Sequence, residues 1–407
     1  MPHHPTRREL LLASGVLFAW AHMPKVALAE GRDPRLLVVV LRGALDGLSA
    51  VAPVGDPNWQ RLRGDNALTS DRALPLDNFF ALNPAMPNLH RLYRAGQATI
   101  VHAAATPYRE RSHFDGQDIL ESGMPRVGSA ESGWLNRALQ GLQPEGRVEN
   151  RRAFAVGPIT PLVARGPAPI LSWVPPRLQP AAADTAARLL DLYRHTDPAL
   201  AAALQERRDL AAIAMGGGMS LSPQKAGEKP TGPGAGNRIY FAEAAGGAAK
   251  FMARPDGPRV GALAFDGWDT HVNEGAADGR LALLLSALDG AIGAIETNMG
   301  DAWKQTAVAI ITEFGRTARI NGTAGTDHGT ATVALLAGGA LKGGRVIADW
   351  PGVADKNLHD GRDLKPTTDL RAVLKGLLRD HLRVDERALA TTVFPGSDDV
   401  KPMSGLV

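Results

Sequence analysis

Apolar, β-branched runs recur along the chain and alternate with amphipathic stretches. The apolar runs predict strands at Arg35–Leu41, Ala98–Ala104, Ala153–Val156, Val260–Phe265, Val308–Ile311 and Thr332–Ala337. The amphipathic stretches predict helices at Met86–Ala95, Asp184–His195, Pro198–Ala212, Leu281–Asn298 and Thr368–His381. Continuously apolar strands that alternate with helices are typical of a parallel sheet covered on both faces. We therefore expect an α/β fold with three α/β/α layers and a mostly parallel sheet.

One stretch interrupts this alternation. Residues Gly216–Gly236 (GGGMSLSPQKAGEKPTGPGAG) contain mainly glycine, proline and small polar residues, which do not form a packed element. The expected strands before and after this stretch are alike, being short apolar runs, and polar residues follow the strands in both halves of the chain. We therefore expect residues 30–407 to form a single domain with a flexible excursion at 216–236. A boundary between two domains is the alternative.

Residues 1–29 resemble an export signal. Arg7 and Arg8 precede a weakly apolar run that ends near Ala21, and Ala27-Leu28-Ala29 has the small-x-small pattern of a cleavage site. Paired arginines at this place resemble a twin-arginine signal, which implies the twin-arginine export machinery as a partner and a periplasmic or secreted bacterial protein. A short amphipathic helix is the alternative. No later segment approaches a membrane-spanning length, so we expect no stable membrane anchor.

Composition narrows the function classes. The 407 residues are 44% hydrophobic and 21% charged, as in globular proteins. Of the net charge of +3, residues 1–29 carry +2, which leaves +1 on the rest. Without a basic stripe interleaved with aromatic residues, we expect no nucleic acid partner. The chain has no cysteine, which excludes disulfides, a thiol nucleophile, thiolate metal ligands and a cysteine-derived formylglycine.

Acids and histidines follow the expected strands and gather in the loops between them. These residues are Asp46, Asp269, His271, Glu313, Asp327 and His328. The carboxyl ends of parallel strands meet at one edge of a sheet, where open α/β folds build their active sites. Carboxylate oxygens and imidazole nitrogens are ligands for divalent metals. Each motif also has a structural alternative: Glu313 could cap a helix, and Asp327-His328 could form a polar turn.

The segment Thr106–Asp115 (TPYRERSHFD) adds a hydroxyl and further charges. Ser112 opens an expected helix, either as its N-cap, with Asp115 three residues later, or as a nucleophile. His113 is a satisfied imidazole, a general base or a metal ligand. Arg109 and Arg111, together with Arg316 after Glu313, could clamp an anionic substrate, the alternative being surface salt bridges.

The order of these motifs resembles the alkaline phosphatase superfamily. The segments VVVLRGALDGLSAV, TPYRERSHFDGQDILESG, EFGRT and TDHGT look like one exported bacterial family of unknown function within it. The resemblance implies an alkaline phosphatase-like fold, a phosphoric or related ester as small-molecule substrate, and Ser112 as nucleophile. It also implies a divalent metal held by Asp46, Asp269, His271, Glu313, Asp327 and His328. Mixed nitrogen and oxygen ligands favour zinc or manganese and leave magnesium, calcium and iron open.

Two departures from the superfamily pattern keep a second function in view. Asp269 and His271 are two residues apart where the superfamily usually has D-x-x-x-H, and Phe314 stands where it has a histidine ligand. The favoured expectation is an exported metal-dependent hydrolase that forms a phosphoserine at Ser112. The alternative is a catalytically inactive binding or assembly protein that retains the fold. A metal-free serine hydrolase is a weaker alternative because the chain lacks the G-x-S-x-G elbow.

Overall fold

The computed structural model describes residues 32–128, 130–142, 153–156, 160–173 and 235–407, with a few positions between 190 and 205. The chain divides into two compact units, Met1–Asp33 and Pro34–Val407, and all elements below lie in the second. The export signal expected at 1–29 lies outside the described residues. The helices expected at Asp184–His195 and Pro198–Ala212 lie largely outside them, as does all but the end of the excursion at 216–236.

The elements confirm the expected strands and helices where these fall on described residues, except that the helix expected at Thr368–His381 begins at Leu370, because Thr368–Asp369 form a short strand. The strands are β1 Arg35–Arg42, β2 Val51–Ala52, β3 Leu74–Pro75, β4 Ala81–Leu82, β5 Ala98–Ala105, β6 Ala153–Val156, β7 Ile170–Trp173, β8 Val260–Asp266, β9 Thr306–Thr312, β10 Thr332–Ala337, β11 Arg345–Ile347 and β12 Thr368–Asp369. The α-helices are α2 Gly47–Ala50, α3 Trp59–Arg63, α4 Pro87–Arg94, α5 His113–Ser122, α6 Trp134–Gln140, α9 Ala235–Ala253, α10 Arg280–Met299, α11 Leu370–Asp380 and α12 Glu386–Ala388. Short stretches of 3-10 helix are η1 Gly64–Asn66, η2 Leu162–Ala164, η3 Gly300–Gln305 and η4 Asp355–Asn357, and η5 Leu389–Val393 is a π-helical stretch.

A large mixed sheet forms the centre of the second unit. Within the described residues its strand order is β11-β5-β10-β9-β1-β8-β6-β7, with β12 paired to β5, and β2, β4 and β3 form a separate small sheet. The central strand β1 runs parallel to both of its neighbours, β8 and β9. Strand β10 is antiparallel to both β5 and β9, an orientation that its apolar sequence does not specify.

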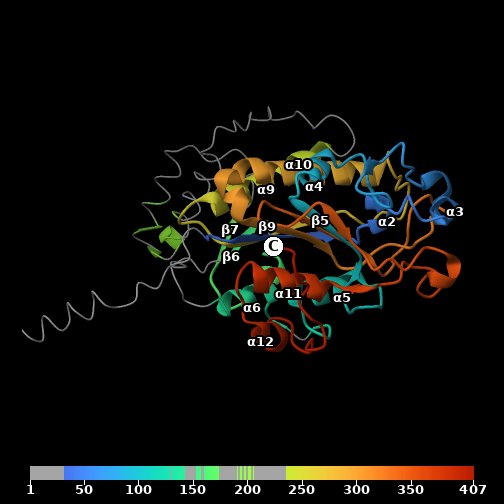
Figure 1. The fold of residues 1–407 in the computed structure, drawn as a ribbon. Helices are drawn as coiled ribbons and strands as arrows, with labels where there is room; N and C mark the ends of the chain where they lie inside the picture. Colours follow the sequence, from blue (N-terminus) through green and yellow to red (C-terminus); the bar gives the residue numbers. More distant parts are fainter. Residues whose placement is uncertain are drawn as a thin grey trace, which may run out of the picture. The chain divides into compact units, whose positions relative to one another are not determined.

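The alternation of side chains along β1 explains why helices cover both faces of the sheet. Leu37, Val39 and Leu41 pack in the core shared with α4, α9 and α10. Leu36, Val38 and Val40 point the other way, into the core shared with α6 and α11. Figure 1 shows the two groups of helices on opposite sides of the sheet. Burying each such side chain contributes about 1.5–3 kcal/mol, so a strand apolar at every position is most stable at the centre.

Helix α10 corrects one expectation from the sequence. Among the described residues, the continuous helical stretch Arg280–Gln305 is long and apolar enough to cross a membrane by length and composition. The apolar pattern of the sequence predicts no such segment after residues 1–29. In the structure, Leu285, Leu288, Ile292 and Ile295 of this stretch are buried in the core against the sheet. Its apolar character is therefore used in packing within the domain.

Candidate metal centre

The polar residues meet at one edge of the sheet because the strand ends are in register. Leu41 of β1 pairs with Phe265 of β8 and with Thr312 of β9, so these three parallel strands end side by side. Strand β5 runs in the same direction as β9, because both are antiparallel to β10. The antiparallel β10 begins at this edge. The loop before β10 therefore reaches the same place as the loops after β1, β5, β8 and β9.

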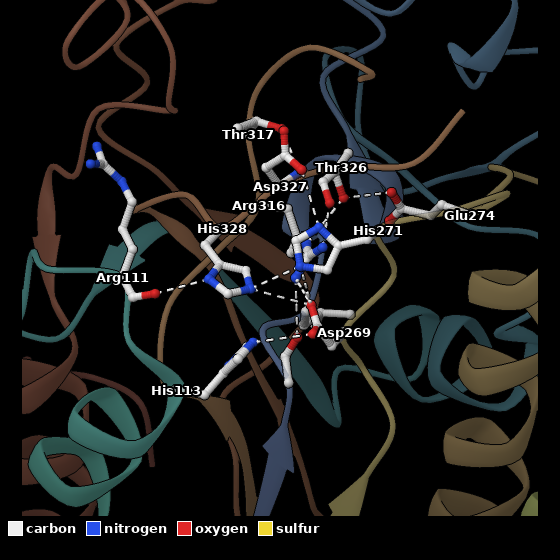
Figure 2. A network of polar contacts seen from close by, with 12 residues as sticks. Arg111, His113, Asp269, His271, Glu274, Arg316, Thr317, Thr326, Asp327 and His328 are labelled. Atoms are coloured by element: carbon white, nitrogen blue, oxygen red, sulfur yellow. Dashed lines mark hydrogen bonds and ion pairs between the residues drawn. The ribbon is translucent and has the colours of Figure 1, made fainter. Parts of the chain in front are cut away.

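Three imidazoles surround one carboxylate at this edge (Figure 2). Asp269 Oδ1 lies 3.0 Å from His271 Nε2 and 3.4 Å from His328 Nε2. Asp269 Oδ2 lies 3.5 Å from His113 Nε2, and the two nitrogens His271 Nε2 and His328 Nε2 are 3.0 Å apart. We call His113, Asp269, His271 and His328 the histidine–aspartate cluster. One ligand atom each from His113, Asp269 and His328 lie within 4.8 Å of one another, a spacing that could hold a metal ion.

The Nδ1 nitrogen of each histidine in the cluster is hydrogen-bonded to an oxygen. His113 Nδ1 lies 2.8 Å from Glu313 Oε1, and His271 Nδ1 lies 3.1 Å from Asp327 Oδ1. His328 Nδ1 lies 2.9 Å from the backbone carbonyl oxygen of Arg111. A carbonyl oxygen only accepts, and an ionised carboxylate only accepts, so each Nδ1 carries the proton. In the neutral form of each ring, Nε2 then presents a lone pair to the cluster.

With each Nδ1 protonated, the Nε2 lone pairs of the cluster require a positive charge beside them. Two lone pairs on His271 Nε2 and His328 Nε2 face each other across 3.0 Å and repel. His113 Nε2 is buried and has no hydrogen-bond partner among the described residues. A cation between these atoms, either a proton or a metal ion, removes the repulsion. The cluster is therefore built to hold positive charge.

Neighbouring groups set the charge of the cluster. Burial raises the pKa of Asp269, but hydrogen bonding and attraction from Arg316 outweigh it and leave this pKa below its ordinary value. Burial likewise raises the pKa of Glu313, and the hydrogen bond with His113 helps to bring it below normal. The hydrogen bond to Glu313 raises the pKa of His113, whereas burial lowers the pKa of His328. Both carboxylates are thus anionic near neutral pH.

The structure assigns the six expected metal ligands to three different places. Asp269, His271 and His328 belong to the histidine–aspartate cluster, which His113 joins. Glu313 and Asp327 stand behind the imidazoles as acceptors from Nδ1. Asp46 is elsewhere: it is fully buried, its two oxygens lie 2.6 and 2.9 Å from Arg63 Nη1 and Nη2, and it caps α2. The structure does not bring Asp46 into contact with the cluster.

Phe314 occupies the position where the superfamily pattern has a histidine ligand. Its buried ring stacks against His113 at a centroid distance of 5.1 Å and lies 5.5 Å from His328. Gly116 of α5 has no side chain at this point, and a Cβ there would come within 2.9 Å of the Phe314 ring. Phe314 therefore supplies an apolar wall that fixes the His113 ring.

Ser112 is the N-cap of α5, which was one of the two expected roles. Its backbone is extended, and its hydroxyl accepts a long hydrogen bond of 3.5 Å from the amide of Asp115. The helix continues to Ser122 and ends at Gly123, whose φ of +68° suits the left-handed cap of a helix. Ser112 is thus bonded to its own helix, directly beside a histidine of the cluster.

The three arginines expected to bind substrate all have partners within the protein. Arg316 is buried and donates to Asp269 Oδ1 at 2.5 Å and to Thr326. Arg111 donates through Nε and Nη2 to Asp363 Oδ2 at 3.0 and 2.8 Å. Arg109 donates to the carbonyl of Tyr108 at 2.7 Å and to that of Thr106. None of the three guanidinium groups depends on an external anion for its hydrogen bonds.

Several residues that hold the site could not be recognised in the sequence. They are Glu274, Asn321, Thr326, Arg362 and Asp363. Glu274 Oε2 accepts from the Thr326 hydroxyl at 2.6 Å, and Thr326 accepts from Arg316 Nε at 3.1 Å. Burial raises the pKa of Glu274 to about 8. Of these residues, only Glu274 and Thr326 had a signal in the sequence, because each lies within three residues of an expected ligand.

The chain belongs to the family described as "Protein of unknown function (DUF1501)", which matches residues 92–393. No curated protein matches the chain. Solved structures show a distant likeness. Ps i-CgsB in complex with k-i-k-neocarrahexaose shares 11% identity over 91% of this chain and 77% of its own, with a TM-score of 0.43.

Two further solved structures are distantly similar to the chain. The C-terminal periplasmic domain of EcEptC from Escherichia coli, in complex with zinc, shares 10% identity over 76% of this chain and 74% of its own, with a TM-score of 0.36. The phosphonate monoester hydrolase of Agrobacterium radiobacter shares 11% identity over 77% and 70%, with a TM-score of 0.33. The geometry of the site itself therefore has to carry any functional argument.

Proposed function

We propose that the histidine–aspartate cluster binds a divalent metal ion and that the protein is a metal-dependent hydrolase of phosphoric or related esters. One observation carries the proposal: three imidazole Nε2 atoms converge on Asp269 while an oxygen acceptor holds each Nδ1. Histidines that ligate metals are oriented in this way, by donating their other ring N–H to a carboxylate or a carbonyl.

The spacing of the donor atoms supports zinc or manganese. Ligands at about 2.0–2.2 Å from a tetrahedral zinc ion stand roughly 3.4 Å apart. The separations from Asp269 oxygens to the three Nε2 atoms are 3.0, 3.4 and 3.5 Å. Manganese and iron accept the same mixture of nitrogen and oxygen, whereas magnesium and calcium prefer oxygen alone. The donor set thus fits a transition-metal ion better than the harder cations.

The residues around the cluster suit cleavage of an anionic ester. A bound metal ion would supply Lewis acidity and positive charge for the oxygens of the ester. The N-terminus of α5, next to His113, adds backbone N–H groups and a favourable dipole for an anion. The 3.5 Å hydrogen bond that holds Ser112 Oγ is weak, so rotation of this side chain frees the hydroxyl at little cost. In the proposed reaction Ser112 Oγ gives up its proton and attacks phosphorus, the bond from phosphorus to the ester oxygen breaks, and that oxygen takes a proton and leaves as the alcohol. Water then attacks phosphorus, which releases the phosphate or phosphonate and restores the serine hydroxyl.

Replacing Ser112 by asparagine separates chemistry from capping. Asparagine caps helices about as well as serine but has no hydroxyl. Ser112→Asn should lower turnover more than about 1000-fold, because only the nucleophile is removed. The free energy of unfolding should change by less than about 0.5 kcal/mol, whereas Ser112→Ala should also lose about 1 kcal/mol of stability. The assay is nitrophenol release from nitrophenyl phosphate and phosphonate esters, with zinc or manganese and after chelation.

Full turnover in Ser112→Asn would exclude this serine as nucleophile. Metal-loaded wild-type protein that cleaves none of the esters would instead favour the second candidate, a binding or assembly protein that retains the site without turnover. Asp46 supports this second candidate, because Arg63 neutralises the carboxylate expected to hold metal. Phe314 supports it as well, because an apolar ring stands where a histidine ligand was expected.

The proposal extends to fold family and location. Helices on both faces of the central sheet support a three-layer, alkaline phosphatase-like domain. Arg7-Arg8 and the Ala27-Leu28-Ala29 pattern support export by the twin-arginine machinery to the periplasm or beyond. The substrate would then be a small-molecule ester met outside the cytoplasm.

A further inference from the structure

The loop His359–Asp363 contacts His328 of the histidine–aspartate cluster and also Arg111, whose backbone carbonyl bonds to His328. The buried Asp363 accepts from the Arg111 guanidinium through Oδ2, at 3.0 and 2.8 Å, and from the Thr330 hydroxyl at 2.8 Å. The adjacent Arg362 donates to the backbone carbonyl of His328 at 2.8 Å. The loop closes on itself through hydrogen bonds between the backbones of His359 and Asp363. It therefore ties Arg111, which precedes the N-cap of α5, to the loop that carries His328.

Arg111 has an unusual backbone at the point where it meets the cluster. Its φ is +60°, in the left-handed region that residues with a side chain occupy at a cost. This conformation places its carbonyl oxygen 2.9 Å from His328 Nδ1. In Figure 2 the carbonyl meets His328 while the guanidinium extends away from the cluster. The side chain is thus used as an anchor, and the backbone is the part that touches the site.

We infer that Asp363 is a positioning residue: by anchoring the Arg111 side chain it keeps the Arg111 carbonyl on His328 Nδ1, which leaves His328 Nε2 deprotonated and aimed at Asp269. The inference rests on the metal centre proposed above. It assigns to Arg111 a structural role in place of the substrate contact expected from the sequence. A fixed acceptor at Nδ1 matters because a ring that flips or changes tautomer no longer offers Nε2 to a metal.

Arg111 has a second carboxylate partner that provides a matched control. Asp360 Oδ2 lies 3.2 Å from Arg111 Nη2, but its side chain is 63% exposed, whereas the side chain of Asp363 is 0% exposed. Exposed ion pairs contribute little, because water screens them. Asp360→Asn and Asp363→Asn therefore make the same chemical change to two partners of one guanidinium, and only the second should disturb His328.

The test measures zinc affinity and the protonation of His328 separately. Asp363→Asn should weaken zinc binding by about 10- to 100-fold, the usual effect of losing an outer partner of a ligand, and Asp360→Asn by less than about 2-fold. In metal-free protein, nitrogen NMR should show His328 protonated at Nδ1 in the wild type and in Asp360→Asn. In Asp363→Asn it should show a mixture of tautomers. The His328 signal is identified by its loss in His328→Gln.

Arg111→Lys guards against a simple folding defect in Asp363→Asn. Lysine keeps the charge beside Asp363 but lacks the two-pronged contact, so it should give a smaller loss of zinc affinity in the same direction. Wild-type affinity together with a wild-type tautomer in Asp363→Asn would overturn the inference. If the wild type itself binds no zinc, the metal proposal fails, and the tautomer alone decides the role of Asp363: an unchanged Nδ1–H signal overturns it, and a mixture supports it.

Discussion

His102 and His328 lie near the same edge of the sheet, and their surroundings differ in the partners of their ring nitrogens. His102 lies within β5 and is fully buried. Its Nε2 donates to the carbonyl of Val51 at 2.9 Å, and its Nδ1 accepts from the amide of Ala103 at 2.8 Å. His328 has a backbone partner for Nδ1 only, and its Nε2 faces His271 and Asp269.

The difference shows that a structural histidine and a candidate ligand are distinguished by the partners of both ring nitrogens as well as by burial: His102 is fully buried, whereas the side chain of His328 is 26% exposed. Both nitrogens of His102 are satisfied, and burial lowers its pKa to about 4, so the ring stays neutral near pH 7. Its ring also stacks on Phe80 at 5.1 Å, as a core side chain does. In His328 the Nδ1 nitrogen has a fixed backbone partner, and the Nε2 nitrogen faces His271 Nε2 and the carboxylate of Asp269. His102 is thus a structural imidazole with both nitrogens satisfied, whereas the geometry of His113 and His328 suits ligands.

The largest expected effect is on metal binding, and it separates the two histidines. His328→Gln should weaken zinc affinity more than about 100-fold, because losing a ligand costs more than the 10- to 100-fold loss of an outer partner. His102→Gln should leave zinc affinity within about 2-fold, because His102 has no free nitrogen. Competition with a chromophoric chelator measures both values. Equal zinc affinity in the two variants would remove the distinction drawn here.

The next effect is on stability in acid. The folded-state pKa of His102, about 4, lies below its ordinary value of 6.5, so the unfolded chain binds the proton more tightly. Stability from the neutral ring is therefore complete above pH 6.5 and is lost as the pH falls toward 4, by about 3 kcal/mol between pH 7 and pH 4. Urea unfolding across this range measures it. His102→Gln should lack this component, and an equally steep acid loss in the variant would contradict the assignment.

Glu274 is a buried acid whose contribution to stability changes with pH in the opposite direction to that of His102. Its folded-state pKa of about 8 lies above the ordinary 4.5 because of burial and nearby Asp46. Stability from the neutral carboxyl is present below pH 4.5 and is lost as the pH rises toward 8, by about 2 kcal/mol between pH 5 and pH 7. Glu274→Gln cannot ionise and should therefore gain on the wild type as the pH rises. Parallel stability curves for wild type and Glu274→Gln would show that Glu274 does not titrate in this way.

Most of the fold could be predicted from local pattern. Residues Leu36–Leu41 are apolar at every position, which specifies a strand buried on both faces, and β1 has this environment. The direction of β10 could not be predicted, because apolar residues suit parallel and antiparallel neighbours equally. That direction turned out to help the site, since it brings the loop with His328 to the edge where β1, β8 and β9 end.

The site was predictable in membership but not in roles. Histidines beside acids near strand ends pointed to His113, His271 and His328. Whether an acid faces the cluster or stands behind a ring depends on side-chain direction, which separates Asp269 from Glu313 and Asp327. Asp46 was predicted as a metal ligand, because nothing in the sequence marks Arg63 as its partner. Asp363 was not predicted, because its contact with Arg111 joins loops 252 residues apart.

The central claim is that the histidine–aspartate cluster binds a divalent metal ion, and elemental analysis tests it most directly. The protein would be expressed with residues 1–29, purified without chelator and compared with Asp269→Ala/His271→Ala. The control is His90→Ala, which changes an exposed histidine bonded to the carbonyl of Pro75. We predict one equivalent of zinc or manganese in the wild type and the control and none in the double variant. Absence of metal from all three proteins, even after zinc or manganese is added, would contradict the account.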